Sequence, residues 1–283
     1  MTTEDAPEIT LTPTSFHRGN VAADADSDLA SQIFVLDAQE AMAGVGRLRD
    51  WALDALAPAA GEVAVDVGCG AGAEVRRLAT AVGSAGRAIG VEPHPGLRAE
   101  AVRRAQAEGS TATFVDGDAA DLPFADGSVD VLRCERVFQH LPDPEAAARD
   151  FARVLAPGGR VAVTDSDWGS MVQSVGDPDV VRRINESSWR RMANPFSGRH
   201  LRRQLSAAGL EVSPDIGSTA VVLPDELLRD PVMLRLNAAL AVEEGTVTAA
   251  EAARVEEEVA AAAVSGEVLV AVTMFCVVAR RPG

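Results

Sequence analysis

The sequence predicts an α/β fold in which a doubly wound, mostly parallel sheet carries a nucleotide-type binding turn. A short apolar run leads into a glycine-rich turn at 63–72, Val-Ala-Val-Asp-Val-Gly-Cys-Gly-Ala-Gly, and a helical pattern follows from Glu74 to the glycine at 83. Further short apolar runs alternate with helical patterns along the chain, as strand–helix–strand units require. Such a turn places a ligand at the carboxyl edge of a parallel sheet.

The residues of the turn narrow the class of ligand. Gly68, Gly70 and Gly72 remove side chains from the turn, so the backbone can pass close to a ligand. The turn also fits Gly-x-Gly-x-x-Ala, and this keeps a nicotinamide-dependent oxidoreductase as an alternative. Asp66, two residues before the first glycine, would repel a pyrophosphate but suits a ligand with an ammonium group and no phosphate. S-adenosylmethionine is such a ligand.

At this turn the chain resembles the class I S-adenosylmethionine-dependent methyltransferases, whose first motif is an acid, an apolar residue and Gly-x-Gly-x-Gly. The resemblance continues at family spacing through a strand ending at Glu92, the strand at 113–115 followed by Asp118, a strand from Val129, the Pro-Gly-Gly turn at 157–159 and the strand at 161–165. It implies a Rossmann-like, seven-stranded sheet with an antiparallel last strand. The length of the C-terminal helices resembles small-molecule members, especially the ubiquinone- and menaquinone-type group.

The resemblance also implies a site for S-adenosylmethionine, with S-adenosylhomocysteine as product. Glu92 would hold the ribose hydroxyls, Asp118 would accept from the adenine amino group, and the backbone of Ala119 would meet the ring edge. The remaining residues that we expect at the cofactor are Asp66, Gly68, Cys69, Gly70, Gly72, Pro93, Cys134 and Glu135.

The segment after the fourth strand should face the transferred methyl group in a protein of this family. His140 is a candidate base, because imidazole titrates near neutral pH; the alternative is a structural histidine that braces the loop before Pro142. Arg133 is a candidate anchor for a substrate anion, with a salt bridge to Glu135 or Asp165 as the alternative.

Other substrate candidates come from three parts of the chain. Phe138 and Gln139 belong to the segment after the fourth strand, and Asp165 and Trp168 follow the fifth strand, where the alternative for Trp168 is core packing. Phe16 and His17 interrupt a polar N-terminal stretch and would enter the site if the N-terminal helices act as a lid. A solvated His17 is the alternative.

Composition limits the functions that the chain can have. Among 283 residues the formal net charge is −16, and every basic residue is arginine; this charge disfavours nucleic acid and anionic membranes as partners. The three cysteines are isolated, so we expect no metal, no disulfide framework and no cysteine cluster of the kind an arsenic methyltransferase needs. No apolar run is long enough for a membrane span, and we expect a cytoplasmic enzyme that is a monomer or homodimer.

The domain organisation follows from the same patterns. We expect a tail and two lid helices in residues 1–57, and a methyltransferase domain in 58–283 with a helical cap insertion at about 224–264. Thr248 and Glu251 fit a capping box at the start of one cap helix. Residues 268–278 form an apolar run that predicts the last strand.

The predicted function is methyl transfer from S-adenosylmethionine to an oxygen, nitrogen or carbon nucleophile of a small molecule, in natural-product tailoring or quinone metabolism. One alternative is a fold relative that binds S-adenosylmethionine without methyl transfer, either as a pseudoenzyme or as a catalyst of another rearrangement. The other is the nicotinamide-dependent oxidoreductase, which Asp66, Asp118 and the antiparallel last strand disfavour.

Overall fold

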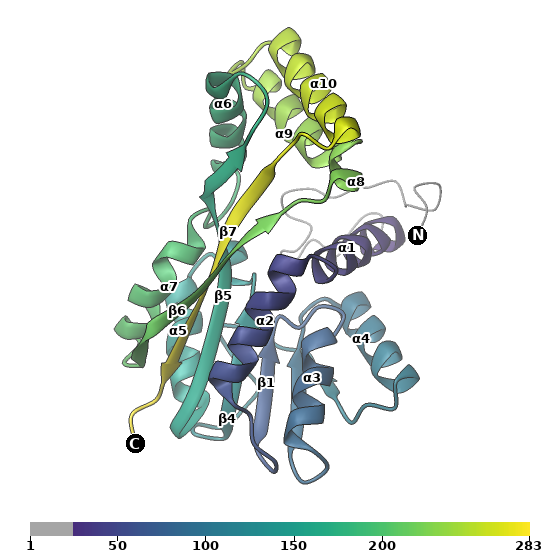
Figure 1. The fold of residues 1–283 in the computed structure, drawn as a ribbon. Helices are drawn as coiled ribbons and strands as arrows, with labels where there is room; N and C mark the ends of the chain where they lie inside the picture. Colours follow the sequence, from purple (N-terminus) through teal and green to yellow (C-terminus); the bar gives the residue numbers. More distant parts are fainter. Residues whose placement is uncertain (1–24) are drawn as a thin grey trace.

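A computed structural model of the chain describes residues 25–283 (Figure 1). The helices are α1 (Ala25–Glu40), α2 (Ala43–Leu56), α3 (Ala73–Val82), α4 (Pro95–Ala107), α5 (Pro144–Val154), α6 (Pro178–Trp189), α7 (Ser197–Ala207), α8 (Asp225–Leu228), α9 (Val232–Glu243) and α10 (Ala249–Ser265), with a short 3₁₀ helix η2 (Phe138–His140). The strands are β1 (Val63–Val67), β2 (Arg87–Val91), β3 (Thr113–Val115), β4 (Val129–Glu135), β5 (Leu155–Gln173), β6 (Glu211–Val222) and β7 (Val270–Arg280).

The strands form one seven-stranded sheet in the order β3-β2-β1-β4-β5-β7-β6. Pairing from β3 to β5 is parallel, and β7 runs antiparallel to both β5 and β6. The chain order reverses direction between β1 and β4, which is where open α/β sheets bind ligands. The predicted fold class, with its antiparallel last strand, is confirmed.

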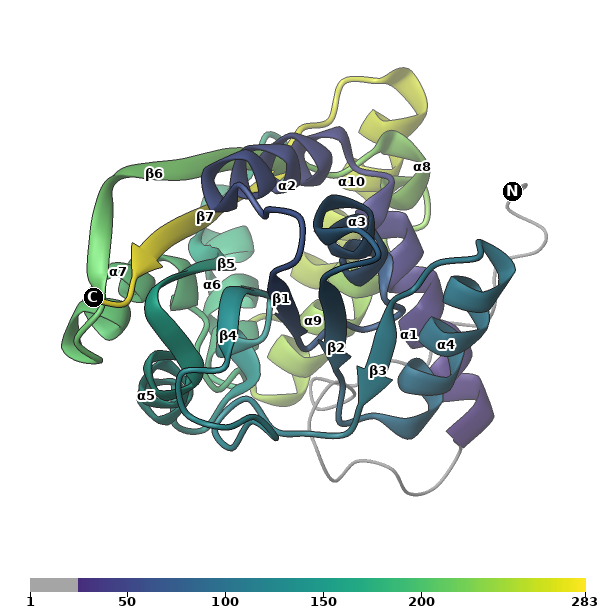
Figure 2. The same cartoon turned by 90° about the horizontal axis from the view of Figure 1, so that it is seen from below.

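Different helices cover the two faces of the sheet (Figure 2). Successive side chains of each strand face opposite sides of the sheet. Val65 and Leu132 belong to a core cluster that includes Phe151 of α5 and residues of α7. Ala64, on the other face, belongs to a second cluster with Val45 of α2 and residues of α3. Helices thus cover both faces, and the carboxyl edge between them is left for a ligand.

Strand β5 is longer than the sequence predicts. Residues 166–173 contain aspartate, serine and glycine and resemble a loop, but their pairing with the apolar β7 keeps them extended, with a register shift between Asp167 and Val172. Pro214 interrupts the sequence pattern of β6. The structure accommodates it because β6 is an edge strand whose register shifts between Val212 and Ile216.

A helical cap lies beyond the far ends of β5 and β7 (Figure 1). The sequence places it at about 224–264, where α8, α9 and α10 lie, but α6 from the preceding connection also packs into it through Val180 and Ile184. The predicted capping box is present: the Thr248 hydroxyl accepts from the backbone N–H of Glu251, whose side chain accepts from Thr248 N–H. Among residues 25–283, no helix is long and apolar enough to cross a membrane.

Candidate functional site

A cavity of about 630 Å³ opens at the carboxyl edge of the sheet. It is bordered by the turn after β1 and by the segments that follow β2, β3 and β4, while Leu36 and its neighbours on α1 form another wall. The predicted site residues that line this cavity are Asp66, Gly68, Cys69, Gly70, Glu92, Pro93, Asp118, Ala119, Arg133, Glu135, Gln139 and His140. The topology therefore brings together residues that lie up to 74 positions apart, from 66 to 140.

The glycine turn is held against the end of β2. The backbone N–H groups of Gly68 and Cys69 both donate to the Val91 carbonyl, at 2.8 and 3.1 Å. Gly68 and Gly70 have φ angles of +68° and +53°, a region that side chains disfavour. The Gly70 N–H donates to Glu92 Oε2 at 2.9 Å, so the turn and the acid at the tip of β2 form one unit.

Glu92 is buried and keeps hydrogen-bonding capacity for a ligand. Its second oxygen, Oε1, accepts from the His94 N–H at 2.9 Å. Each carboxylate oxygen can accept two hydrogen bonds, so both remain able to accept from a pair of ribose hydroxyls. Burial raises the pKa of Glu92, although the bonds from His94 and Gly70 counteract this rise.

Replacing Glu92 by alanine should weaken S-adenosylhomocysteine binding by about 1–3 kcal/mol, because ribose hydroxyls would lose their acceptor. Isothermal titration calorimetry measures this change. Glu92→Gln serves as the matched variant that keeps the shape and one acceptor oxygen and should lose less. Asp118→Ala should also lose less, since it removes one contact and leaves ring packing intact; unchanged affinity in Glu92→Ala would contradict the assignment.

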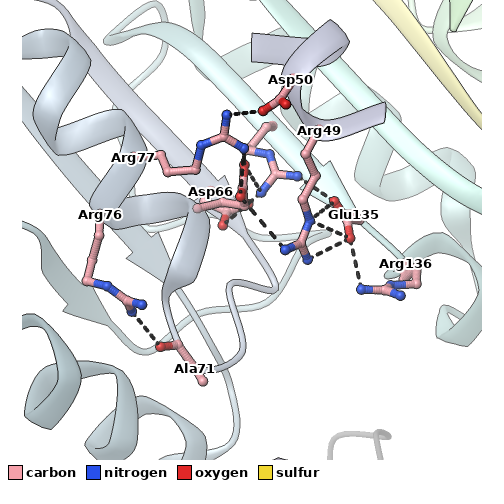
Figure 3. Close-up of polar contacts among 10 residues, drawn as sticks. Arg49, Asp50, Asp66, Ala71, Arg76, Arg77, Glu135 and Arg136 are labelled. Atoms are coloured by element: carbon pink, nitrogen blue, oxygen red, sulfur yellow. Dashed lines mark hydrogen bonds and ion pairs between the residues drawn. The ribbon is translucent and has the colours of Figure 1, made fainter. Parts of the chain in front are cut away.

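A buried cluster of ion pairs forms the floor of the cavity beside the glycine turn (Figure 3). Glu135 is its centre: Arg49 of α2 donates to both carboxylate oxygens, with Nη2–Oε1 2.9 Å and Nε–Oε2 3.0 Å. Arg133 and Arg136 contact the same carboxylate at 2.6 and 2.9 Å. Burial alone would raise the pKa of Glu135, but the three guanidinium groups outweigh it and hold the pKa below its usual range.

Arg133 is paired within this cluster. Besides Glu135, its guanidinium lies 3.6 Å from Asp66 and 3.4 Å from Glu74. Burial would lower its pKa, but these acids raise it overall. The salt bridge to Glu135 that the sequence offered as the alternative is therefore present, and the charge of Arg133 is shared among three carboxylates.

Two buried aspartates give the protein a predictable pH dependence. Burial raises the pKa of Asp66 from 3.8 to about 7, with Arg133 opposing the shift, and burial likewise raises that of Asp165 to about 7. Between about pH 4 and 7 the folded state then holds protons that the unfolded chain has released. The free energy of unfolding should therefore fall as the pH rises through this window and level off above it.

Chemical denaturation at pH 5, 6 and 7.5 tests this expectation. Asp66→Asn and Asp165→Asn should each flatten the decline, since amides do not titrate. The lowered pKa of Glu135 acts in the opposite sense, but only at more acidic pH, so the two effects separate. A wild-type stability that rises between pH 5 and 7.5 and is unaffected by either substitution would contradict the raised pKa values.

The loop that carries His140 is clamped from the segment before α7. Asn194 Nδ2 donates to the carbonyls of Phe138 and Leu141, at 2.9 and 2.5 Å, and the Asn194 N–H donates to the Gln139 carbonyl at 3.1 Å. Asp165 Oδ2 accepts from the Gln139 N–H at 2.9 Å. These bonds hold η2 in place while His140 lines the cavity.

Five predicted site residues lie outside the cavity wall. Cys134 and Phe138 are core residues, 1% and 0% exposed, and Phe138 packs on Phe151 with ring centroids 5.7 Å apart. Asp165 is completely buried, and its carboxylate accepts a hydrogen bond from the backbone of η2. The other two are Trp168, whose indole N–H donates to Gln139 Oε1, and Gly72, where a Cβ would lie within 3 Å of the Phe114 ring.

Phe16 and His17 lie outside the described residues. Sequence reasoning also missed cavity residues, namely Arg49, Glu74 and Arg136. The sequence carries no local signal for Arg49, because its partners lie on other elements. Glu74 had a weak signal as an acid in the first turn of the helix after the glycine turn.

A family model described as a methyltransferase domain matches residues 65–163, the segment that contains the glycine turn, Glu92, Asp118 and His140. This match, together with the relatives and the solved structure described below, supports a class I S-adenosylmethionine-dependent methyltransferase. The matched segment runs from β1 into β5 and includes four of the strand ends that border the cavity.

Comparisons over longer parts of the chain find varied relatives. An uncharacterised 37.1 kDa protein in transposon TN4556 of Streptomyces fradiae is 36% identical over 231 residues, 81% of this chain and 65% of that protein. An arsenite methyltransferase of Halobacterium salinarum is 33% identical over 211 residues, 73% of this chain and 51% of that protein. The chain thus spans less than two thirds of either relative.

Among solved structures, the YcgJ protein of Bacillus subtilis shares the fold, with a TM-score of 0.55 at 19% identity over 84% of this chain and 99% of that one.

Proposed function

We propose that this methyltransferase chain binds S-adenosylmethionine in the cavity at the carboxyl edge and transfers its methyl group to a nucleophilic oxygen, nitrogen or carbon of a small molecule. The observation that carries the proposal is the convergence, on one cavity, of a turn in which Gly68 and Gly70 carry no side chain, buried Asp66 and buried Glu92. A glycine cradle, an acid for an ammonium group and an acid for ribose hydroxyls fit this cofactor.

When bound, the cofactor supplies an electrophilic methyl group on a sulfonium. The residues of this chain then have three tasks: to bind, to align and to move a proton. Asp66 and Glu92 would fix the two ends of the cofactor, and the Asn194-clamped loop would hold His140 at the reacting end. His140 would accept a proton from the acceptor as the acceptor's bond to the methyl carbon forms, and S-adenosylhomocysteine would be left as the product.

The cysteines argue against an arsenite acceptor for this chain, even though one relative carries that name. Cys134 and Cys276 are buried, and Cys69 lies in the glycine turn. A side chain on Gly90 would lie 2.6 Å from the Cys69 sulfur, so this thiol packs against β2. We therefore propose a small organic acceptor, from natural-product tailoring or quinone metabolism, rather than a thiophilic ion.

Calorimetry and a transfer assay test the proposal. The wild-type protein should bind S-adenosylmethionine and S-adenosylhomocysteine at micromolar strength and show no saturable binding of NADH. Methyl-labelled S-adenosylmethionine should then transfer label to a small molecule in a cell extract. Tight NADH binding would favour the oxidoreductase instead, and cofactor binding without any label transfer would favour a catalyst of another rearrangement or a pseudoenzyme.

A further inference from the structure

Arg136 stands out among the cavity residues because its backbone is strained. Its φ is +56°, and Ala57 is the only other non-glycine residue among 25–283 with a positive φ. A bulky side chain in this region is costly and persists only where surrounding contacts hold it. The Arg136 N–H donates to the Thr164 carbonyl of β5 at 2.8 Å, which fixes this conformation and directs the residue to the β4–β5 side of the cavity.

The guanidinium of Arg136 is largely buried, and few groups in the described part of the chain offset the loss of its hydration. Its side chain is 13% exposed and lines the cavity, and its ion pair in the described part of the chain is to Glu135 Oε1. A guanidinium has five N–H donors, so most of its hydrogen-bonding capacity is left for other groups. Burial lowers the pKa of Arg136, with Glu135 opposing the shift.

The charges around Arg136 leave it short of a counter-charge. Glu135, its carboxylate partner, is also bonded by Arg49 (Figure 3). Arg133 contacts the same carboxylate. Arg133 has two further acids within 4 Å, and Arg49 reaches Glu74 at 3.8 Å. Arg136 has the fewest acids within 4 Å of the three arginines, with Glu135 as its ion-pair partner and Asp165 as a more distant acid that also acts on its charge. A partly desolvated guanidinium in that position binds a carboxylate more strongly than an exposed one does.

We infer that Arg136 binds a carboxylate group carried by the acceptor. The inference rests on the proposed function, because the cavity segment after β4 must face the transferred methyl group for an acceptor to meet Arg136 there. The planar fork of the guanidinium suits bidentate contact with a carboxylate, and the shared Glu135 fixes the orientation of that fork. The acceptor class is therefore a small organic acid rather than a neutral molecule.

Two sets of binding titrations test the inference. They distinguish whether Arg136 binds a carboxylate of the acceptor or the carboxylate of the cofactor. The first titrates S-adenosylhomocysteine and 5′-methylthioadenosine, which lacks the amino-acid part, into wild type, Arg136→Gln and Arg136→Lys. The second titrates benzoate and the isosteric neutral benzamide into each protein, with and without S-adenosylhomocysteine. Arg183→Gln is the matched control, because Arg183 also pairs with one carboxylate, Glu251, but lies in the helical cap.

Wild type and Arg183→Gln should bind benzoate about tenfold or more tightly than benzamide. Arg136→Gln should lose this preference and keep its affinity for both adenosine ligands, and Arg136→Lys should keep part of the preference. Equal binding of the two probes by wild type, or a preference that survives in Arg136→Gln, would overturn the inference. So would a loss of affinity in Arg136→Gln confined to S-adenosylhomocysteine, which would assign Arg136 to the cofactor's carboxylate.

Failure of the proposed function would look different. Wild type would then bind neither adenosine ligand. The comparison of benzoate with benzamide in the absence of cofactor would still show whether Arg136 binds a carboxylate.

Discussion

Replacing Gly70 by valine is expected to abolish S-adenosylhomocysteine binding, a loss of at least about 100-fold in affinity, or roughly 2.7 kcal/mol. Gly70 has a φ of +53°, and a Cβ there would lie 3.1 Å from Leu36 Cδ1 on the opposite wall of the cavity. A branched side chain would occupy the ligand's volume. It would also strain the backbone conformation that orients the Gly70 N–H toward Glu92. Calorimetry of the purified variant measures the loss.

Gly109→Val separates the loss of cavity volume from the backbone strain. Gly109 has a φ of +64°, and a Cβ there meets nothing within 4 Å. Both variants should therefore lose stability through strain, and thermal unfolding should show similar decreases. Only the Gly70 variant should lose binding. If Gly70→Val remains folded and binds S-adenosylhomocysteine like wild type, the turn is not the cofactor cradle.

The sequence predicted the parallel half of the fold well because its signals are local. Residues 63–72 combine a strand pattern with a glycine turn. The structure shows why glycine is needed there, because Gly68 and Gly70 have positive φ angles that other residues rarely adopt. The extension of β5 to Gln173 had no such signal. Its hydrogen bonds come from β7, about 100 residues later in the chain, and the pairing overrides the loop-like composition.

The site could be predicted in part for the same reason. Residues just after β1, β2 and β3 reach the cavity because parallel strands end at a common edge. In β4, alternate residues face opposite sides of the sheet: Arg133 and Glu135 line the cavity, and Cys134 between them belongs to the core. Arg49 and Arg136 were missed because their roles depend on a carboxylate from another element or on an unusual backbone angle.

His140→Ala should lower turnover by about 10²–10⁴-fold if His140 is the base that takes the acceptor's proton. The structure gives the loop supports other than the imidazole, namely the Asn194 amide and the Asp165 carboxylate. Removing the imidazole should therefore leave the melting temperature and S-adenosylhomocysteine affinity nearly unchanged. The loss would fall on the transition state, and the rate–pH profile should lose its ascending limb in the range where imidazole titrates.

Asn194→Ala is the matched variant for the bracing alternative, because it removes two bonds to the loop, those to Phe138 O and Leu141 O, and leaves the imidazole in place. It should melt earlier and bind S-adenosylhomocysteine less tightly, while its remaining activity keeps the ascending limb. Label transfer from S-adenosylmethionine, measured across pH for both variants, compares the two effects. Should His140→Ala instead behave like Asn194→Ala, with early melting, weaker binding and only a modest fall in turnover, His140 braces the loop. Catalysis would then depend on alignment and on an acceptor that is already deprotonated.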